Sequence, residues 1–303
     1  MTFSQNRPLL LVITGPTASG KSDLAIQLAH HFDTEIISAD SRQFYHQIPI
    51  GTAQPSAEEL AKVPHHFIGN LNLSETMSAG EYARHVHDLL ALLFETKKIV
   101  ILCGGTGLYI KALLHGLDEI PTVKTEIREE LNHRLAAEGL PALTSQLQLL
   151  DPEYCQHADL QNPQRVIRAL EVCLSENKPF SSFRNSHDKK DLPFDYKLFC
   201  LSPSRNKLYE RINTRVDKML EAGFEKEARN AWEFRNYNAL KTVGFNEWFD
   251  YFEEKLSRTE AIEKIKQHTR NYAKRQLTWF RKMEGVVFIN KEPFEAVLAE
   301  IEK

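Results

Sequence analysis

A glycine-rich loop near the N-terminus carries the clearest chemical signal in this sequence. Residues 15–22 read GPTASGKS, which fits G-x-x-x-x-G-K-S, between an apolar run at 8–14 and a helical pattern at 21–32. In such loops, backbone N–H groups surround phosphate oxygens, the lysine adds positive charge and the serine hydroxyl can hold Mg²⁺. We predict a phosphate site, with Ser22 as an Mg²⁺ ligand. The loop comprises Gly15, Pro16, Thr17, Ala18, Ser19, Gly20, Lys21 and Ser22.

Two further polar residues follow apolar runs that have the length of buried strands. Asp40 comes directly after EIISA at 35–39, and Thr106 lies in GGTG after KIVILC at 98–103. The carboxyl ends of parallel strands meet at one edge of a sheet, where ligands bind. Asp40 could bind Mg²⁺, cap the next turn or act as a general base, and Thr106 could contact a ligand or stabilise a turn.

The parts that accompany this loop in nucleotide hydrolases are missing. The run at 98–103 ends in Gly-Gly-Thr and not in the acidic residue that would organise Mg²⁺. The guanine-reading pattern N-K-x-D is also absent, since the nearest string is Asn177-Lys178-Pro179-Phe180. The loop is therefore expected to hold a phosphorylated group without ordinary nucleotide hydrolysis.

The apolar runs alternate with helical patterns, as in an α/β protein with a parallel sheet covered on both faces. We predict a P-loop NTPase-like parallel sheet flanked by helices, formed by residues 1–118 and 195–303. The segment 119–194 shows helical patterns and no strong strand, so it is predicted to be a helical insertion domain. The core is expected to resume with a strand at 195–202 and to be mainly helical over 205–284.

Composition limits the partners and the cellular compartment. The 303 residues carry a net charge of −3, so any contact with nucleic acid must depend on local patches. The four cysteines are scattered, which favours a reducing compartment over disulfides or zinc. The apolar runs are shorter than the roughly 18 residues that a membrane helix needs. We expect a cytoplasmic protein without a membrane partner, and no metal site at His65-His66.

A basic helix is predicted near the C-terminus. Residues 264–282 contain seven Lys or Arg and no acidic residue, a pattern that suits RNA, a membrane surface, a peptide-binding groove or plain solvent. Helical geometry predicts an apolar inner arc and a basic outer arc. The inner arc contains Ile262, Ile265, Tyr272, Trp279, Phe280 and Met283, and the outer arc contains Lys266, Arg270, Lys274 and Arg281.

Seven ordered strings together give the sequence a specific resemblance. They are GPTASGKS (15–22), ISADSRQFY (37–45), IGTAQPS (50–56), VPHHFIG (63–69), CGGTGLYIKALLHGL (103–117), NPQRVIRALEV (162–172) and AKRQLTWFRK (273–282). The chain thus resembles the tRNA dimethylallyltransferase (isopentenyltransferase) family. The resemblance implies transfer of a dimethylallyl group from dimethylallyl diphosphate to N6 of adenosine 37 of a tRNA, with Mg²⁺. We separately expect the protein to be a monomer.

The resemblance also implies roles for individual residues. The 15–22 loop would hold the diphosphate, Asp40 would take the proton from the adenine amine, and Thr106 would orient the reacting groups. The target base would be extruded from the RNA. Residues at tRNA-contact positions are Asp40, Ser41, Arg42, Gln43, Thr106, Arg128, Gln164, Arg165, Val166, Ile167, Arg168, Lys274, Arg275, Gln276, Leu277, Thr278, Trp279, Phe280 and Arg281.

The sequence departs from the family pattern at one place, and two rival functions stay open. The family commonly has V-G-Y, then Arg or Lys, then Glu, whereas residues 243–247 here read VGFNE, which weakens the case for tRNA contact there. A small-molecule kinase would need an arginine-bearing lid, and none is evident in the sequence. A non-catalytic RNA-binding protein would tolerate Asp40→Ala. For His65-His66 the family match suggests a structural or pocket-wall role.

Overall fold

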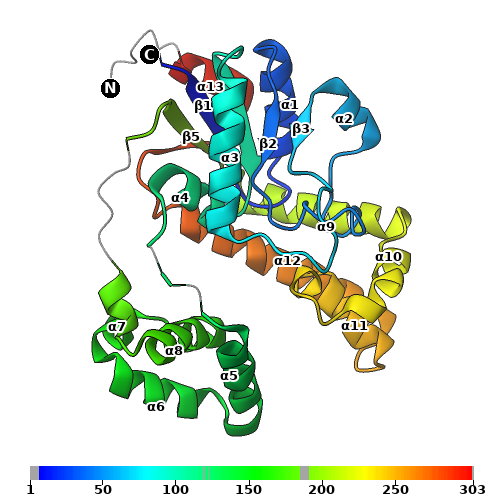
Figure 1. Cartoon of the computed structure of the whole chain (residues 1–303). Helices are drawn as coiled ribbons and strands as arrows, with labels where there is room; N and C mark the ends of the chain where they lie inside the picture. Colours follow the sequence, from blue (N-terminus) through cyan, green and yellow to red (C-terminus); the bar gives the residue numbers. More distant parts are fainter. Residues whose placement is uncertain (1–6, 119, 122, 185–190, 302–303) are drawn as a thin grey trace. The chain divides into compact units, whose positions relative to one another are not determined.

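The computed structural model describes residues 7–118, 120–121, 123–184 and 191–301, and these form two compact units (Figure 1). The first unit combines the described parts of 1–114 and 191–303, and the second covers those of 115–190. The second unit thus begins and ends four residues earlier than the insertion expected at 119–194.

The first unit contains a six-stranded parallel sheet in the order β3-β2-β4-β1-β5-β6. This confirms the predicted α/β class and parallel sheet. In β1 every residue of LLLVIT is buried, because the strand pairs with β4 on one side and β5 on the other. The strands are β1 (Leu9–Thr14), β2 (Ile36–Ser38), β3 (His65–His66), β4 (Ile99–Gly104), β5 (Asp195–Leu201) and β6 (Val286–Ile289).

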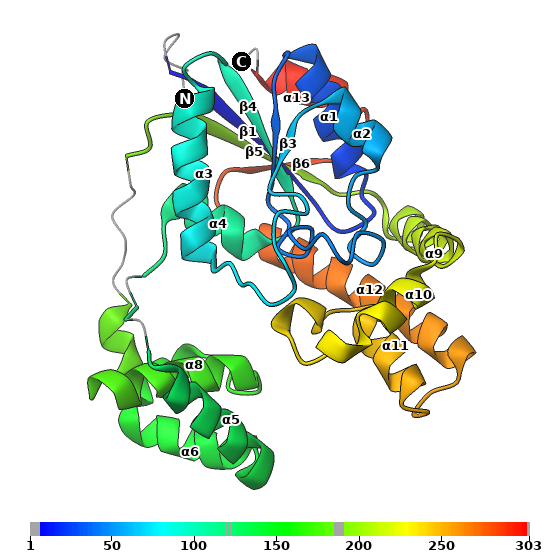
Figure 2. The ribbon, with the colours of Figure 1, turned by 45° about the vertical axis from the view of Figure 1, so that its right-hand side comes forward.

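Helices cover both faces of this sheet. Figure 2 shows α3 (Ala79–Leu93) on one side of the strands and α1 (Lys21–His31) with α13 (Pro293–Ile301) on the other. Leu24 and Leu28 of α1 pack on Leu11 and Ile13 of β1 in one buried cluster. The central strands β1 and β4 are apolar on both sides because helices cover both faces of the sheet there. This explains why their sequences are unbroken apolar runs.

A layer of helices lies beyond the carboxyl ends of the strands (Figure 1). Its aromatic core includes Phe224, Phe245 and Trp248, all fully buried, and it also holds Tyr45 and Ile48 from the segment after β2. The layer thus joins the segment after β2 with helices that are distant from it in sequence, beside the ligand edge of the sheet. Its helices are α9 (Arg205–Glu221), α10 (Phe224–Asn230), α11 (Phe245–Phe252) and α12 (Arg258–Phe280), with short turns η2 (Trp232–Phe234) and η3 (Asn238–Leu240).

The basic helix forms as α12, but part of its outer arc faces α9. The Lys266 ammonium lies 2.7 Å from a carboxylate oxygen of Asp217, and Arg270 donates a hydrogen bond of 2.8 Å to Asn213. The prediction that the basic arc faces outward was therefore wrong for these two residues. The apolar periodicity of α12 does not show which helix packs beside it, so these contacts with Asp217 and Asn213 of α9 could not be predicted.

The second unit is helical, as expected for this segment. The continuous helical pattern at 125–150 divides at Gly139, whose φ of 81° favours glycine and ends a helix. Its core includes Leu131, Leu143, Leu147 and Leu170. The helices are α5 (Thr125–Glu138), α6 (Leu140–Leu150), α7 (Pro152–His157) and α8 (Pro163–Glu176), followed by η1 (Phe180–Phe183).

Several peripheral elements were not predicted. The edge strands β3 and β6 are two and four residues long and partly exposed, so they lack the apolar run that reveals central strands. The short helix α2 (Ala57–Lys62) buries no side chain. Helix α4 (Gly107–His115) directly follows the turn that contains Thr106. Within the part of the chain that the structure describes, no helix is long and apolar enough to cross a bilayer.

Candidate functional site

A cavity of about 430 Å³ lies in the first unit and collects residues from both halves of that unit. Its walls come from the loop after β1, the turns after β2 and β4, the segment before α11, and helices α9 and α12. The separated stretches predicted to converge at the sheet edge therefore do meet there. The predicted site residues that line the cavity are Thr17, Asp40, Ser41, Arg42, Thr106, Arg275 and Gln276.

Thr106 fixes the turn that carries Asp40. Its hydroxyl accepts a hydrogen bond of 3.0 Å from the backbone N–H of Ser41, and its own N–H donates to the carbonyl of Ala39 at 3.1 Å. The two strand ends approach so closely that a Cβ at Gly104 would lie 2.3 Å from the backbone of Ala39. Thr106 thus positions Asp40 by holding the neighbouring backbone. This role is compatible with both expected roles of Thr106, which were to contact a ligand or to stabilise a turn.

Gln276 of α12 connects the phosphate loop to the turn after β4. Its side-chain oxygen accepts from the N–H of Thr17 at 2.8 Å, and its amide donates to the carbonyl of Gly105 at 3.0 Å. Gln276 is only 6% exposed, and a Cβ at Gly105 would lie 2.3 Å from its amide nitrogen. Both ends of this amide are therefore engaged within the protein, where the resemblance implied an RNA contact.

Two arginines of α9 reach the phosphate loop and were missed by the sequence analysis. Arg215 donates to the hydroxyl of Thr17 at 3.1 Å, and Arg211 donates to the carbonyl of Ser19 at 3.0 Å. Burial lowers the pKa of Arg215, while the nearby Asp40 acts in the opposite direction. These arginines belong to a packed helix and do not form the arginine-bearing lid that a small-molecule kinase would need. The signal available in the sequence was the four-residue spacing of two arginines on one amphipathic helix.

The loop has the features of an anion site. No side chain caps the N-terminus of α1, so its first N–H groups stay available to a ligand. The Ser19 hydroxyl is buried and has no hydrogen-bond partner among the described residues. Burial lowers the pKa of Lys21, which Cys103 and Asp40 oppose. An anion bound here would satisfy these donors and favour the charged form of the lysine.

The residues present also fit Mg²⁺ held chiefly by the oxygens of a bound phosphate. Ser22 is exposed in the first turn of α1, next to Lys21 of the phosphate loop. Among the described residues, no three His, Cys, Asp or Glu side chains form a metal-binding group. Mg²⁺ commonly binds through one or two protein oxygens together with substrate phosphates. Ser22 and Asp40 are the residues that could supply those protein oxygens.

The two nearby cysteines are buried and do not line the cavity. Burial raises the pKa of Cys103 to about 12 and that of Cys200 to about 12, so both stay neutral thiols at physiological pH. Asp40 is the one carboxylate among the described residues that line the cavity. Its Oδ1 accepts a hydrogen bond of 3.1 Å from the N–H of Arg42. Asp40 is therefore the candidate proton acceptor.

Arg42 and Gln43, both predicted RNA contacts, support the cavity walls. The Arg42 guanidinium donates to the carbonyls of Asn238 at 2.7 Å and Ala239 at 3.2 Å, which holds the segment that precedes α11. The Gln43 amide donates to the carbonyl of Ala53 at 2.9 Å. These side chains link the Asp40 turn to the nearby turn at Ala53 and to the distant segment at 238–239.

Glu227 of α10, which the sequence analysis also missed, holds the turn at 48–54 against the cavity. Its two carboxylate oxygens accept hydrogen bonds from the N–H groups of Ile50 at 2.8 Å and Gly51 at 2.7 Å. Gly51 lines the cavity, and a Cβ there would lie 2.4 Å from Phe224 and 2.5 Å from Phe245. Burial raises the pKa of Glu227, while these two hydrogen bonds lower it.

Replacing this carboxylate should loosen the turn without removing any group from the cavity. We expect Glu227→Gln to lower kcat/KM about tenfold and the free energy of unfolding by about 1–3 kcal/mol, because one buried N–H loses its acceptor. Steady-state kinetics and urea unfolding measure the two effects. Glu221→Gln, at the exposed C-terminal end of α9, is the control, and equal effects of the two substitutions would contradict the assignment.

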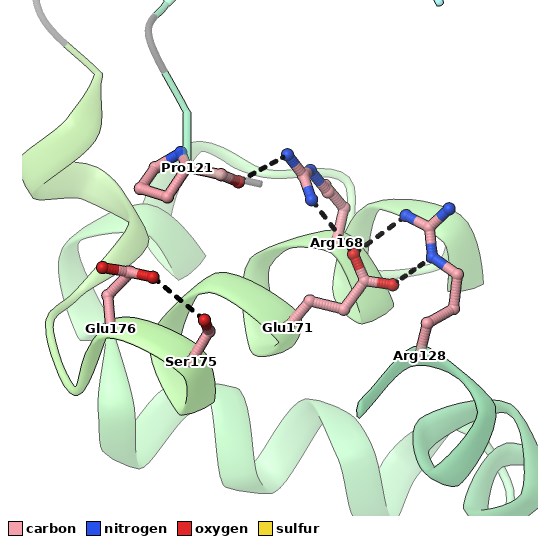
Figure 3. Close-up of polar contacts among 6 residues, drawn as sticks. All are labelled: Pro121, Arg128, Arg168, Glu171, Ser175 and Glu176. Atoms are coloured by element: carbon pink, nitrogen blue, oxygen red, sulfur yellow. Dashed lines mark hydrogen bonds and ion pairs between the residues drawn. The ribbon is translucent and has the colours of Figure 1, made fainter. Parts of the chain in front are cut away.

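In the second unit, two predicted RNA-contact arginines share one buried carboxylate (Figure 3). Glu171 is 1% exposed and accepts two hydrogen bonds from Arg128, one of them 2.9 Å long from Nη2, and one of 3.2 Å from Nη1 of Arg168. Arg168 also donates to the carbonyl of Pro121 at 3.4 Å. Side-chain exposures of 55% and 35% leave part of each guanidinium accessible. Gln164 and Arg165 are exposed nearby on α8.

Other predicted contact residues are distributed between surface and core. Val166 and Ile167 are buried in the core of the second unit, and Phe280 is buried in the first, so their side chains are unavailable to a ligand. Leu277 is half-buried, and Trp279 lies against Gly107 with 36% exposure. The exposed members of the α12 segment are Lys274, Arg275, Thr278, Trp279 and Arg281.

The histidine pair lies outside the cavity lining. His66 is paired with Glu35 at 2.6 Å, and His65 forms a hydrogen bond with the carbonyl of Val63 at 2.7 Å. Their contacts are those of a structural edge strand, one of the two roles that the family match suggested.

A parallel sheet with a phosphate loop, cationic helix side chains and one carboxylate in a cavity defines a P-loop-type enzyme that binds a phosphorylated substrate. The model of the IPP transferase family matches residues 43–283, and the chain belongs to this family. The kinase and non-catalytic alternatives are thereby set aside.

Curated relatives and solved structures agree with this membership. A tRNA dimethylallyltransferase of Christiangramia forsetii is 47% identical over 90% of each chain, and tRNA dimethylallyltransferase 1 of Bacteroides fragilis is 43% identical over 97% of each. The tRNA isopentenylpyrophosphate transferase of Bacillus halodurans has a TM-score of 0.70 at 33% identity, covering 98% of this chain and 94% of that one. A eukaryotic dimethylallyltransferase acting on tRNA has a TM-score of 0.77 at 27% identity, covering 97% and 77%.

Proposed function

We propose that this chain transfers a dimethylallyl group from dimethylallyl diphosphate to N6 of adenosine 37 in tRNA, next to the anticodon. Relatives that match most of its length are named tRNA dimethylallyltransferases, which supports the class of reaction. The observation that carries the proposal is the placement of Asp40, the one carboxylate among the described lining residues, in a cavity that also reaches the phosphate loop.

The charged side of the cavity suits the leaving group. As the C–O bond of the donor breaks, both electrons pass to the diphosphate, whose growing negative charge must be neutralised. Lys21, the free N–H groups of α1 and the Arg215 guanidinium supply fixed positive charge in this region. Mg²⁺, when bound near Ser22, would add Lewis-acid stabilisation of the same oxygens.

The nucleophile needs a base because the adenine amine has its lone pair delocalised into the ring. As the N6–C bond forms, the amine must lose a proton, and Asp40 is placed to accept it. A positioned base of this kind contributes about two to four orders of magnitude to the rate. Thr106 holds the Asp40 turn through Ser41 and the carbonyl of Ala39, so the carboxylate is oriented before the substrates bind.

The apolar part of the cavity lining suits an isoprenoid chain. Six apolar side chains line the cavity, so a five-carbon group can be buried without unpaired polar atoms. Phe245 is fully buried, and Asn246 lines the cavity with an uncharged amide where the family commonly has a cation. The apolar lining residues are Ile212, Val216, Met219, Phe224, Val243 and Ile265.

The RNA must present its target as an extruded base, because an adenine within a stack cannot enter a cavity. The exposed cations of α12 and of the second unit are proposed to bind RNA phosphates, which position the RNA without reading its sequence. We further propose that the enzyme acts as a monomer in the cytoplasm.

The phosphate contacts make a measurable prediction for the salt dependence of binding. Arg165→Ala should reduce the slope of log affinity against log salt concentration by about one, because one phosphate contact is lost. Filter binding of tRNA at several salt concentrations measures it. Arg134→Ala is the control, since that guanidinium is engaged by Glu138 at 2.8 Å.

Incubation with labelled dimethylallyl diphosphate and unmodified tRNA, followed by nucleoside analysis, tests the proposed function. We expect N6-dimethylallyladenosine at position 37 and release of one diphosphate per transfer. Label at another nucleoside would contradict the proposed target, and phosphoryl transfer from ATP without prenylation would support a kinase instead.

A further inference from the structure

Two stacked aromatic rings are exposed on the segment that leads into the cavity wall. Phe234 and Tyr237 are each 41% exposed, and their ring centroids lie 5.9 Å apart with an angle of 18° between the planes. The N–H of Tyr237 donates to the carbonyl of Phe234 at 2.9 Å, which fixes their spacing. Large aromatic side chains are costly to expose, so two of them side by side mark a surface that a partner can cover. We call these two residues the rim pair.

Hydrogen bonds place the rim pair beside the cavity. Asn238, the residue after Tyr237, accepts a hydrogen bond of 2.7 Å from Arg42, which lines the cavity. Lys241 lines the cavity as well, four residues after Tyr237. Between them, Ala239 and Leu240 are buried and anchor the segment. Tyr237 is therefore four residues before the first lining residue of this segment, on a backbone that Arg42 ties to the turn that carries Asp40.

Two basic side chains and one acidic side chain of the same segment lie beside the rim pair. Arg235 lies over the ring of Trp232 with its guanidinium carbon 4.3 Å from the centroid, and Lys241 is exposed at the cavity. Glu233 is the acidic residue of this segment and is also exposed. Aromatic rings next to basic groups form the usual surface for unpaired nucleotides, because every base has a face that can stack.

We propose that the rim pair stacks on an unpaired base of the substrate RNA next to the adenosine that enters the cavity. This inference rests on the proposed function, since extruding the target base leaves its neighbours at the mouth of the cavity without a stacking partner. An aromatic ring at the rim replaces that lost stacking, and so stabilises the extruded state of the RNA.

The expected effect is on RNA binding and not on donor binding. Loss of one base–aromatic stack costs about 1–3 kcal/mol, which is about 5- to 150-fold in affinity. Tyr237→Ala and Phe234→Ala should therefore raise the Kd and the KM for an anticodon stem-loop RNA within this range. The KM for dimethylallyl diphosphate should stay unchanged. Tyr237→Phe should retain nearly all the affinity, because stacking needs the ring and not the hydroxyl.

Leu92→Ala is the matched control, because Leu92 is 64% exposed on α3 and is not among the lining residues of the cavity. It should leave RNA binding unaltered. Circular dichroism melting of each variant separates a folding defect from a binding defect. A rim-pair variant that is folded and binds RNA as tightly as the wild type would overturn the inference, even where prenyl transfer by the wild type upholds the proposed function.

Abasic RNA provides the decisive comparison. Stem-loops that lack the base on the 5′ or the 3′ side of the target adenosine are titrated with the wild type and with Tyr237→Ala. Stacking predicts that one of these abasic RNAs already binds the wild type weakly and loses little more affinity with the variant. Independent, additive losses at both positions would show that the ring contacts something other than a base, and would refute the proposal.

Discussion

Asp40→Asn is expected to lower the rate of prenyl transfer by about 10²- to 10⁴-fold while tRNA binding stays close to that of the wild type. The substitution removes the proton acceptor but keeps the size and shape of the side chain. The remaining amide oxygen can still accept the hydrogen bond of 3.1 Å from the N–H of Arg42, so the turn is preserved. Single-turnover transfer with saturating substrates measures the effect.

The binding measurement decides how this loss is interpreted. A variant that loses both prenyl transfer and tRNA affinity would indicate that Asp40 contributes to RNA binding and does not act as the proton acceptor. A variant that keeps the wild-type rate would assign the proton transfer to water or to another group, and would remove the observation on which the proposed function depends. Asp88→Asn is the control, since it makes the same chemical change on the exposed surface of α3, outside the cavity lining.

Arg215→Gln is expected to reduce kcat/KM for the donor by about 10²- to 10³-fold. Its guanidinium is buried at the phosphate loop, and removing a fixed donor that stabilises developing charge has an effect of this size. Inhibition by inorganic diphosphate should weaken in parallel, because the product carries the same phosphates.

Arg211→Gln is the matched control for this position. Arg211 also binds the loop, through the carbonyl of Ser19, but it is not among the described residues that line the cavity. We expect its loss to reduce kcat/KM less than tenfold. Equal defects in the two variants would show that α9 acts by supporting the loop, and that Arg215 does not contact the diphosphate.

The sequence was informative where function depends on contiguous residues. The phosphate loop, Asp40 and Thr106 each follow an apolar strand, and the rule for parallel sheets was enough to predict that they meet. Long helices and central strands were predictable for the same reason, because burial on one or both faces leaves a periodic pattern.

Residues that act across the fold left no such pattern. The apolar periodicity of their helices predicts that Arg215 and Glu227 are surface residues. In the structure, Arg215 donates a hydrogen bond to Thr17, and Glu227 accepts one from Gly51. Gln276 belongs to a motif shared with the family, but the motif alone does not show that its amide binds Thr17 and Gly105. Such roles depend on which surfaces pack together, and packing is set by the tertiary fold.

The contact between Gln276 and Thr17 also has a consequence for how the protein is made. These residues are 259 positions apart, so a ribosome must release almost the whole polypeptide before the loop gains this partner. Likewise, β1 pairs with β5 only after the intervening second unit has been synthesised. A nascent or prematurely terminated chain therefore cannot form the complete phosphate loop site. The protein can bind its donor in the proposed way only when translation is nearly complete.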